Sequence, residues 1–198
     1  LADTEKIIRA ATGRPEKIFV VDESFMDFCE DSENKSLLGR GDLPENILIV
    51  RSLTKFFSIA GLRAGFAIGA PKMIAAMKKL QLPWAVNALA QQVIPSLYLD
   101  KEHIRKSVDE TARLRRILSR GLAATKIFKP CPSETNFVLC ELVGGWKVPD
   151  MQRELLKDGI LTRSCERMEG LGPGHMRFAV RPEEEIGILL DSVRRIAG

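Results

Sequence analysis

The sequence predicts an α/β fold that continues into a smaller α+β region, and three observations lead to this prediction. Two short apolar runs, Lys17–Asp22 and Ile47–Arg51, are rich in β-branched residues and end in charged ones, as buried strands of a sheet often do. Segments with the helical spacing of apolar residues lie on either side of these runs. The long amphipathic segment Asp100–Leu122 then precedes a stretch in which short strands and helices are mixed.

Three strands and three helices are expected before residue 100. The expected strands are Lys17–Asp22, Ile47–Arg51 and Ala64–Gly69. The expected helices are Ala2–Ala11 with Asp3 or Thr4 as its cap, a segment that Pro71 opens and that reaches Leu80, and Ala85–Leu99 with a bend near Pro95. A polar loop is expected at Glu30–Ser36 and a glycine-containing turn at Gly39–Asp42.

The last third of the chain is expected to hold four strands and two helices. The strands are predicted at Lys126–Phe128, Asn136–Leu142, Ile160–Thr162 and Met176–Val180. The helices are predicted at Pro149–Asp158, with Gly159 as the residue that ends it, and at Pro182–Ala197.

Composition narrows the classes of function. The 198 residues carry a net charge of +4 that is spread along the chain, so neither nucleic acid nor an anionic membrane is indicated as a partner. No apolar run is long enough to span a bilayer, and the first residues do not read as a signal peptide. The 4 cysteines form no C-x-x-C pair and there are only 2 histidines, so no metal site is predicted. We expect free thiols and a cytoplasmic protein.

Lys55 lies in the most informative segment of the chain. It follows the predicted strand Ile47–Arg51, with Ser52 three residues before it and Arg63 eight residues after it. A lysine at the end of a buried strand costs free energy unless it has a partner or a role, and an amine placed there can attack a carbonyl. A hydroxyl and a guanidinium nearby suit an anionic group such as a phosphate ester. Taken alone, the pattern also arises by chance.

Asp22 is a second charged residue at the end of an apolar run. It ends the other apolar run, and an acid at the carboxyl end of a strand in an α/β sheet sits where ligands bind. A lysine that can form a Schiff base and a carboxylate that can pair with a pyridinium nitrogen are the minimum set for pyridoxal 5′-phosphate (PLP).

The segments Val20–Phe25, Ser52–Lys55 and Ala60–Arg63 resemble the paired signatures of fold-type I PLP enzymes of the class I/II aminotransferase group. The residue choices are most similar to the branch of histidinol-phosphate aminotransferases and threonine-phosphate decarboxylases. The resemblance implies that Lys55 bonds the cofactor, that Asp22 keeps the pyridine nitrogen protonated, and that Ser52 and Arg63 bind the cofactor phosphate.

The resemblance also implies a fold and a domain organisation. The fold would be the PLP-transferase type I fold, α/β, present here as its C-terminal portion. Residues 1–100 would complete the large, mainly parallel-sheet domain, residues 101–122 would form a connecting helix, and residues 123–198 a small α+β domain. The half of the enzyme that precedes these residues in the family would be missing, so the fragment alone would be inactive. The intact protein would be a homodimer.

Phe25 departs from the pattern. Aminotransferases of this group usually have a tyrosine there, whose hydroxyl bonds the oxygen of the cofactor ring. The segments around Phe25 and Lys55 look more like those of threonine-phosphate decarboxylases, enzymes of cobalamin biosynthesis. A decarboxylase acting on a phosphorylated amino acid is therefore favoured. A histidinol-phosphate or related aminotransferase, and an inactive fragment, stay open as alternatives.

Three residues of the last third are candidates for binding a small phosphorylated amino acid. Arg177 stands in a mostly apolar strand and cannot lose its charge, so it needs an anionic partner. By resemblance it would hold the substrate carboxylate. The alternatives are an edge-strand arginine whose charged end extends to solvent, or an internal salt bridge with one of Glu183–Glu185. Arg163 would contact the substrate phosphate, or else it is a solvated residue at a strand end. Asn136 would lie near the substrate, or else it caps a strand.

Overall fold

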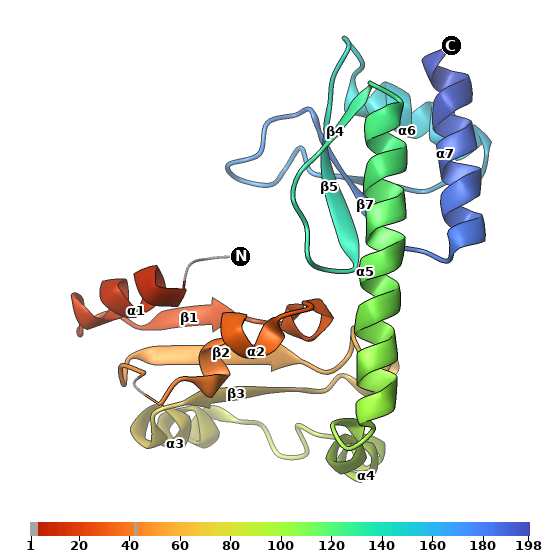
Figure 1. The fold of residues 1–198 in the computed structure, drawn as a ribbon. Helices are drawn as coiled ribbons and strands as arrows, with labels where there is room; N and C mark the ends of the chain where they lie inside the picture. The colour runs from red at the N-terminus through yellow and green to blue at the C-terminus, as the bar shows by residue number, and fades with distance from the viewer. Residues whose placement is uncertain (1–3, 42) are drawn as a thin grey trace. The chain divides into compact units, whose positions relative to one another are not determined.

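The computed structural model describes residues 4–41 and 43–198, and the chain divides into two units, Leu1–Val108 and Asp109–Gly198 (Figure 1). The division falls inside α5 (Lys101–Ala124), the long helix that the sequence predicted at Asp100–Leu122. Each unit has its own sheet and its own buried cluster. The expected boundaries at residues 100 and 122 stay a prediction.

The first unit is built on a three-stranded sheet in the order β1-β2-β3. Strand β1 (Phe19–Asp22) runs parallel to β2 (Ile47–Ser52), with Asp22 opposite Val50. Strand β3 (Gly65–Gly69) runs antiparallel to β2, with Gly65 opposite Ser52. All three predicted strands are confirmed, and the carboxyl ends of β1 and β2 share one edge with the start of β3.

Helices and short turns connect these strands. The α-helices are α1 (Thr4–Thr12), α2 (Ser32–Lys35), α3 (Pro71–Leu80) and α4 (Ala88–Leu97). Single 3-10 turns occur at Met26–Phe28, Leu37–Gly39 and Ala60–Leu62. Pro71 begins α3 as expected, and Pro95 lies inside α4 rather than ending it.

Two predictions for this unit are wrong in detail, and three residues of other predictions lie outside the described residues. The segment Glu30–Ser36 is not a plain loop, because α2 forms within it, with Asp31 at its N-cap. Helix α4 begins at Ala88, later than predicted, because the Asn87 side chain accepts the backbone N–H of Ala90 and caps the helix there. Ala2 and Asp3 of the first predicted helix, and Asp42 of the predicted turn, lie outside the described residues.

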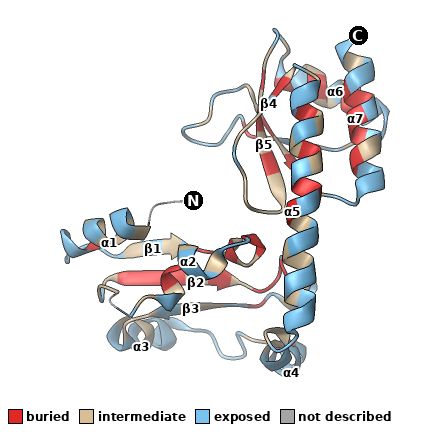
Figure 2. Ribbon diagram, in the orientation of Figure 1, coloured by how far each residue is buried: buried red, intermediate tan, exposed pale blue. Residues whose placement is uncertain are grey.

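Strand β2 is the most buried strand of the first unit (Figure 2). Ile47 and Ile49 pack with Leu37 and Ala11, so α1 and the Leu37–Gly39 turn cover that part of the sheet. By contrast, β1 leaves apolar surface open, with Val20 61% exposed. A second cluster forms around Leu53 at the end of the sheet where β2 leads into the lysine segment.

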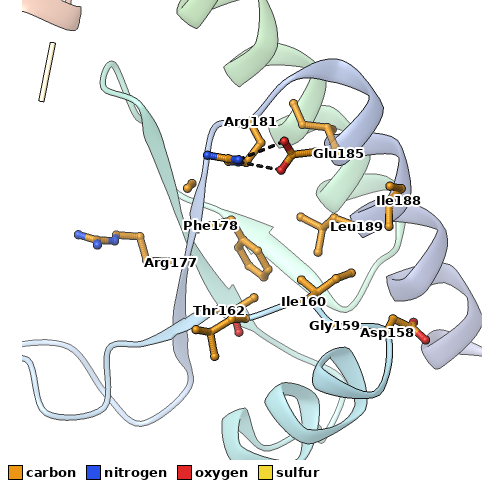
Figure 3. Close-up of a pocket in the computed structure, with 13 residues that line it drawn as sticks. Asp158, Gly159, Ile160, Thr162, Arg177, Phe178, Arg181, Glu185, Ile188 and Leu189 are labelled. Carbon is orange, nitrogen blue, oxygen red and sulfur yellow. Dashed lines mark hydrogen bonds and ion pairs between the residues drawn. The ribbon is translucent and has the colours of Figure 1, made fainter. Parts of the chain in front are cut away.

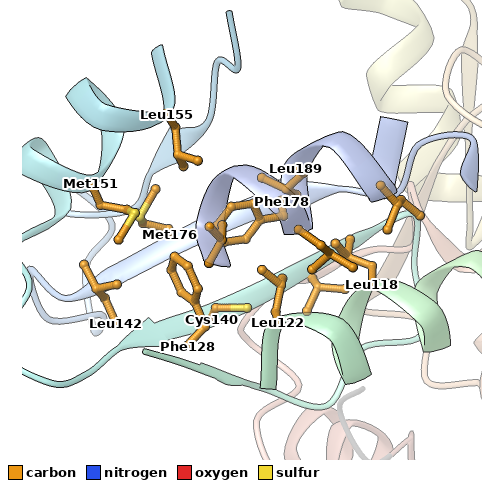
Figure 4. Packing of buried hydrophobic residues seen from close by; sticks show 14 of the residues in the cluster. Leu118, Leu122, Phe128, Cys140, Leu142, Met151, Leu155, Met176, Phe178 and Leu189 are labelled. Atoms are coloured by element: carbon orange, nitrogen blue, oxygen red, sulfur yellow. The ribbon is translucent and has the colours of Figure 1, made fainter. Parts of the chain in front are cut away.

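The second unit is a four-stranded antiparallel sheet in the order β4-β5-β7-β6 with helices on one face. Its strands are β4 (Phe128–Pro130), β5 (Phe137–Leu142), β6 (Arg163–Ser164) and β7 (His175–Ala179), and its helices are α5, α6 (Val148–Lys157) and α7 (Glu183–Ala197). Cys140, Met176 and Phe178 alternate along the strands towards the helices and pack on Leu118 and Met151 (Figure 4). The opposite face of the sheet carries Phe137, Leu139 and Arg177.

Strand β6 was predicted two to three residues too early, at Ile160–Thr162. Gly159 adopts a left-handed conformation with φ of 74°, and the N–H of Ile160 bonds the carbonyl of Leu155 at 3.0 Å. This is a glycine-terminated helix end, so Ile160 still belongs to the cap of α6. The first predicted strand of this unit is displaced for a similar reason: Lys126 has φ of 63° and forms a turn, so β4 begins at Phe128.

None of the helices in the described part of the chain combines the length and the apolar character needed to cross a bilayer.

Candidate active site

Asp22, Phe25 and Lys55 lie together at the carboxyl end of β1. The Asp22 Oδ1 atom accepts the backbone N–H of Ser24 at 2.8 Å. Hydrogen bonds from the side chain and backbone of Ser24 lower the pKa of Asp22, and the nearby positive charge of Lys55 lowers it further. The Lys55 Nζ atom is 5.2 Å from the centre of the Phe25 ring. An ionised carboxylate and a primary amine therefore lie near each other, with the amine beside an aromatic ring.

Lys55 itself is exposed and lies three residues beyond the end of β2. The expectation of a lysine at the end of a buried strand is therefore wrong in detail: burial does not force this amine to find a partner. Its surroundings are nevertheless ordered, because its neighbour Phe56 is buried and packs edge-on against Phe28 with ring centres 5.1 Å apart. Within residues 4–41 and 43–198, Lys55 makes no salt bridge.

Ser52 and Arg63 lie at the same edge of the sheet. Ser52 ends β2, and its Oγ atom is 2.7 Å from the Oγ1 atom of Thr54. Arg63 adopts a left-handed conformation with φ of 51° two residues before Gly65, which pairs with Ser52. The guanidinium donates to the Ala60 carbonyl at 3.0 Å and is otherwise exposed. The five residues predicted for the cofactor thus gather at one end of the first unit's sheet.

A buried ionic cluster directly beside these residues was not predicted. Arg51 donates to Glu23 at 3.0 Å, to Asp27 at 2.7 Å and to Ser36 at 2.9 Å. Burial raises the pKa of Asp27, against the opposing effect of the Arg51 charge. Burial and the charge of Asp27 raise the pKa of Tyr98 to about 12.

The signal for this cluster was present in the sequence. Arg51 stands next to Ser52 and Glu23 next to Asp22, so each charged residue adjoins an apolar strand and a predicted site residue. Charges in such positions are expected to pair with each other once the strands are adjacent.

Arg163 and Arg177 of the second unit stand directly opposite each other on β6 and β7. Residues opposite in an antiparallel pair share a face, so two positive charges lie side by side. The Arg177 guanidinium is 4.8 Å from the centre of the Phe137 ring. Neither arginine forms a salt bridge within residues 4–41 and 43–198, so this is a cationic surface suited to an anion.

The internal salt bridge considered for Arg177 is not formed. Glu183 pairs with Arg113 at 2.7 Å and Glu185 with Arg181 at 2.8 Å. Figure 3 shows the Arg181–Glu185 pair, with the Arg177 side chain directed away from Phe178. This leaves the guanidinium of Arg177 available to a ligand on the outer face of the sheet.

Asn136 lies just before β5, and its backbone carbonyl accepts the N–H of Val180 at 2.9 Å. Its Oδ1 atom is buried and makes no hydrogen bond with any described residue. A buried acceptor without a donor costs free energy, which is consistent with a position completed by a ligand.

The second unit also contains a cavity of about 390 Å³, drawn in Figure 3. It lies between the end of α6, β7 and α7, and is lined mainly by apolar side chains such as Ile160, Phe178 and Leu189. Of the predicted site residues only Arg177 borders it, and its guanidinium points elsewhere. The cavity is therefore distinct from the candidate site. No group of three metal-ligating side chains is found in the described part of the chain.

A carboxylate and an amine at the carboxyl end of parallel strands, beside a hydroxyl and a guanidinium, form the donor set of a PLP site. Comparison with known proteins agrees with this class. Residues 1–193 match the model of the family "Aminotransferase class I and II", and the chain belongs to that family.

Two relatives illustrate its place in the family. The chain is 31% identical over 176 residues, 88% of its length, to a protein of Caldanaerobacter subterraneus subsp. tengcongensis provisionally named threonine-phosphate decarboxylase, of which it covers 47%. It is 29% identical over 194 residues, 98% of its length, to a histidinol-phosphate aminotransferase of Methanococcus aeolicus, of which it covers 51%. The chain thus spans about half the length of these curated relatives.

Solved structures show the same fold. The histidinol-phosphate aminotransferase of Clostridium acetobutylicum is similar over 100% of this chain and 60% of its own, with a TM-score of 0.93 and 28% identity. The enzyme of Sinorhizobium meliloti, solved in complex with pyridoxal-5′-phosphate, is similar in fold over 98% of this chain and 52% of its own, with a TM-score of 0.81 and 22% identity. The predicted PLP-transferase type I fold is confirmed, as is PLP as the cofactor of the family.

Proposed function

We propose that this chain carries the lysine and the ring-nitrogen ligand of a PLP-dependent enzyme that acts on a phosphorylated amino acid. The observation that carries the proposal is the proximity of Asp22 and Lys55 at the carboxyl end of β1, with the Lys55 charge lowering the pKa of the Asp22 carboxyl. Bound PLP supplies an electron sink for the charge that develops when a bond at the substrate Cα breaks.

The residues of the first unit would hold the cofactor. Lys55 would bond its aldehyde carbon, and Asp22, kept ionised by Ser24, would hold the proton on the pyridine nitrogen. Ser52 and Arg63 provide a hydroxyl and a guanidinium for the phosphate ester. Phe25 contributes an aromatic surface beside Lys55, 5.2 Å from its Nζ atom.

The residues of the second unit would bind the substrate. Arg163 and Arg177 are opposite each other and have no acidic partner among the described residues, which suits two anionic groups. Arg177 would take the carboxylate and Arg163 the phosphate, with Asn136 beside them. A substrate with two anionic groups accounts for both charges better than a simple amino acid does.

We propose threonine-phosphate decarboxylase, an activity of cobalamin biosynthesis, as the first candidate. Phe25 supports it, because this residue has no hydroxyl to donate to the cofactor's ring oxygen. The second candidate is a histidinol-phosphate or related aminotransferase, which the similarity to the Clostridium acetobutylicum enzyme supports. In that reaction the Lys55 amine would take the Cα proton as a general base.

Titration of the 198-residue chain with PLP, followed by its visible absorbance, tests the proposal. We expect a saturable change that Lys55→Ala abolishes and that Lys72→Ala, a change at an exposed lysine of α3, leaves intact. Release of CO₂ from threonine phosphate supports the decarboxylase. Amino transfer from histidinol phosphate to a keto acid supports the aminotransferase.

Binding of PLP with neither reaction would support a third proposal, that these residues alone are inactive and need the remainder of a longer homodimeric protein. Absence of any PLP binding by the wild-type chain would refute cofactor binding by these residues and would support the alternative of a non-catalytic fragment that folds, or dimerises, without binding PLP.

A further inference from the structure

Arg51 occupies a fixed place between the two strands that carry the proposed cofactor residues. It immediately precedes Ser52 on β2, and its main partner Glu23 immediately follows Asp22 on β1. The strands are parallel at this point, and the Glu23 backbone N–H donates to the Val50 carbonyl at 2.9 Å. The ion pair therefore joins the residue after Asp22 to the residue before Ser52.

All three nitrogen atoms of the Arg51 guanidinium donate a hydrogen bond in this position. Its Nε atom donates to Glu23, its Nη1 atom to Asp27 and its Nη2 atom to Ser36, with distances of 3.0, 2.7 and 2.9 Å. Glu23 is held in turn by the Ser36 hydroxyl at 2.7 Å and the Leu37 N–H at 2.8 Å. Arg51 and Glu23 are 9% and 4% exposed, so solvent does not weaken these contacts greatly.

The same cluster reaches the segment that carries Lys55. Asp27 belongs to the short turn Met26–Phe28, whose Phe28 ring packs edge-on against Phe56. Phe56 adjoins Lys55, and its ring also packs edge-on against Phe57 at 5.1 Å. A displacement of the Met26–Phe28 turn would therefore reach the backbone of Lys55.

We propose that Arg51 is a positioning residue: it fixes Asp22 and Lys55 relative to each other, and so sets the orientation in which the chain holds PLP. The inference rests on the proposed function, because it concerns the geometry of the same cofactor. Arg51 does not touch the cofactor in this account; it acts through Glu23 and the Met26–Phe28 turn. A lysine cannot replace it, because a single ammonium cannot reproduce a planar fork directed at three partners.

The test compares Arg51→Lys with Arg113→Lys in the 198-residue chain. Arg113 is a matched control, because it also holds two carboxylates, Glu110 and Glu183, at 2.8 and 2.7 Å, but lies on α5 in the second unit. Ser36→Ala is the second variant should Arg51→Lys fail to fold, since it removes one contact of Arg51 and one of Glu23 but keeps the ion pairs of Arg51 with Glu23 and Asp27. The readouts are the dissociation constant of PLP and the visible circular dichroism per bound PLP.

We expect Arg51→Lys to raise the dissociation constant roughly three- to tenfold and to change the dichroism of the PLP that still binds. Ser36→Ala should change both in the same direction by less, and Arg113→Lys should change neither. A merely structural role predicts a lower melting temperature with unchanged dichroism per bound PLP, and that result would overturn the inference alone. If the wild-type chain binds no PLP, the proposed function and this inference are both overturned.

Discussion

Asp22 shows how a single local motif prepares a charged group for a ligand. Its carboxylate is exposed at the end of β1, where nothing in the packing requires a charge. The hydrogen bonds from Ser24 nevertheless lower its pKa, and the Lys55 charge acts in the same direction. An aspartate that stays ionised can hold a proton on a neighbouring heterocycle.

The lowered pKa of Asp22 predicts a pH dependence of stability. A carboxyl whose pKa is lower in the folded than in the unfolded chain contributes stability above its unfolded pKa, and the contribution is lost as the pH falls through the folded pKa. Asp22→Asn should therefore lower the free energy of unfolding at neutral pH, with the difference shrinking as the pH falls below the unfolded pKa of an aspartate, about 3.9. Urea denaturation across this range measures it. A difference that stays constant with pH would contradict the prediction.

Phe25 permits a second prediction at a single residue. Phe25→Tyr places a hydroxyl on the ring beside Lys55, where the resemblance to the aminotransferase group leads us to expect one. A new hydrogen bond to bound PLP should tighten its binding about two- to tenfold, given the usual net value of such a bond. PLP titration measures the change, and Phe128→Tyr, which alters a buried ring of the second unit, serves as the comparison. Unchanged or weaker binding by Phe25→Tyr would show that position 25 does not face the cofactor oxygen.

At the scale of elements, the close approach of β3 to β2 fixes where Ser52 and Arg63 lie. A methyl group at Gly65 would come within 2.6 Å of the Arg51 carbonyl oxygen, which is backbone and cannot move freely. Gly61 lies nearby in the Ala60–Leu62 turn with no atom close to such a methyl group.

Gly65→Ala should therefore cost about 1–3 kcal/mol of stability by overpacking. It should also weaken PLP binding, because it separates β2, which ends at Ser52, from β3, which begins two residues after Arg63. Gly61→Ala should leave both within error. Urea denaturation measures the stability of the two variants, and PLP titration measures their binding of the cofactor. Equal behaviour of the two variants would mean that the β2–β3 contact does not define the site.

For the pair of arginines on β6 and β7 we predict a substitution that raises the stability of the chain. Like charges opposite each other on a sheet are destabilising, so Arg163→Gln should raise the free energy of unfolding by about 0.2–1 kcal/mol in the absence of anions. Inorganic phosphate should stabilise the wild-type chain more than the variant. Arg167→Gln, at an exposed arginine of the following loop, is the control. Phosphate stabilisation that survives in Arg163→Gln would argue against an anion site at this position.

The strands and long helices could be predicted because their patterns are local. The apolar runs before Asp22 and Ser52, and the spacing in α3 and α5, follow from the sequence within a few residues. The start of β6 could not be predicted in this way, because it depends on the Schellman-type end of α6 at Gly159 rather than on the pattern of apolar residues. The sequence shows that Arg51 and Glu23 adjoin the two strands, but it does not show which partners they take. Glu23, Asp27 and Ser36 come together around Arg51 only once β1 and β2 are adjacent.

At the scale of the whole molecule, the proposed chemistry is divided between two units of different character. The first unit carries the residues proposed for the cofactor at the edge of its mixed sheet. The second unit has the larger buried cluster, and it carries Arg163 and Arg177, the arginines proposed for the substrate, on the outer face of its sheet. Each group of residues is compatible with the type I fold that the comparisons identify.

The identity of the lysine that bonds PLP tests the central claim most directly. The chain would be incubated with PLP, reduced with borohydride to make the bond between lysine and cofactor permanent, digested, and mapped by mass spectrometry. We predict a single pyridoxyl phosphate group, on the peptide that contains Lys55, and a loss of that group in Lys55→Ala. Attachment at another lysine, or the same yield in Lys55→Ala as in the wild-type chain, would contradict the account.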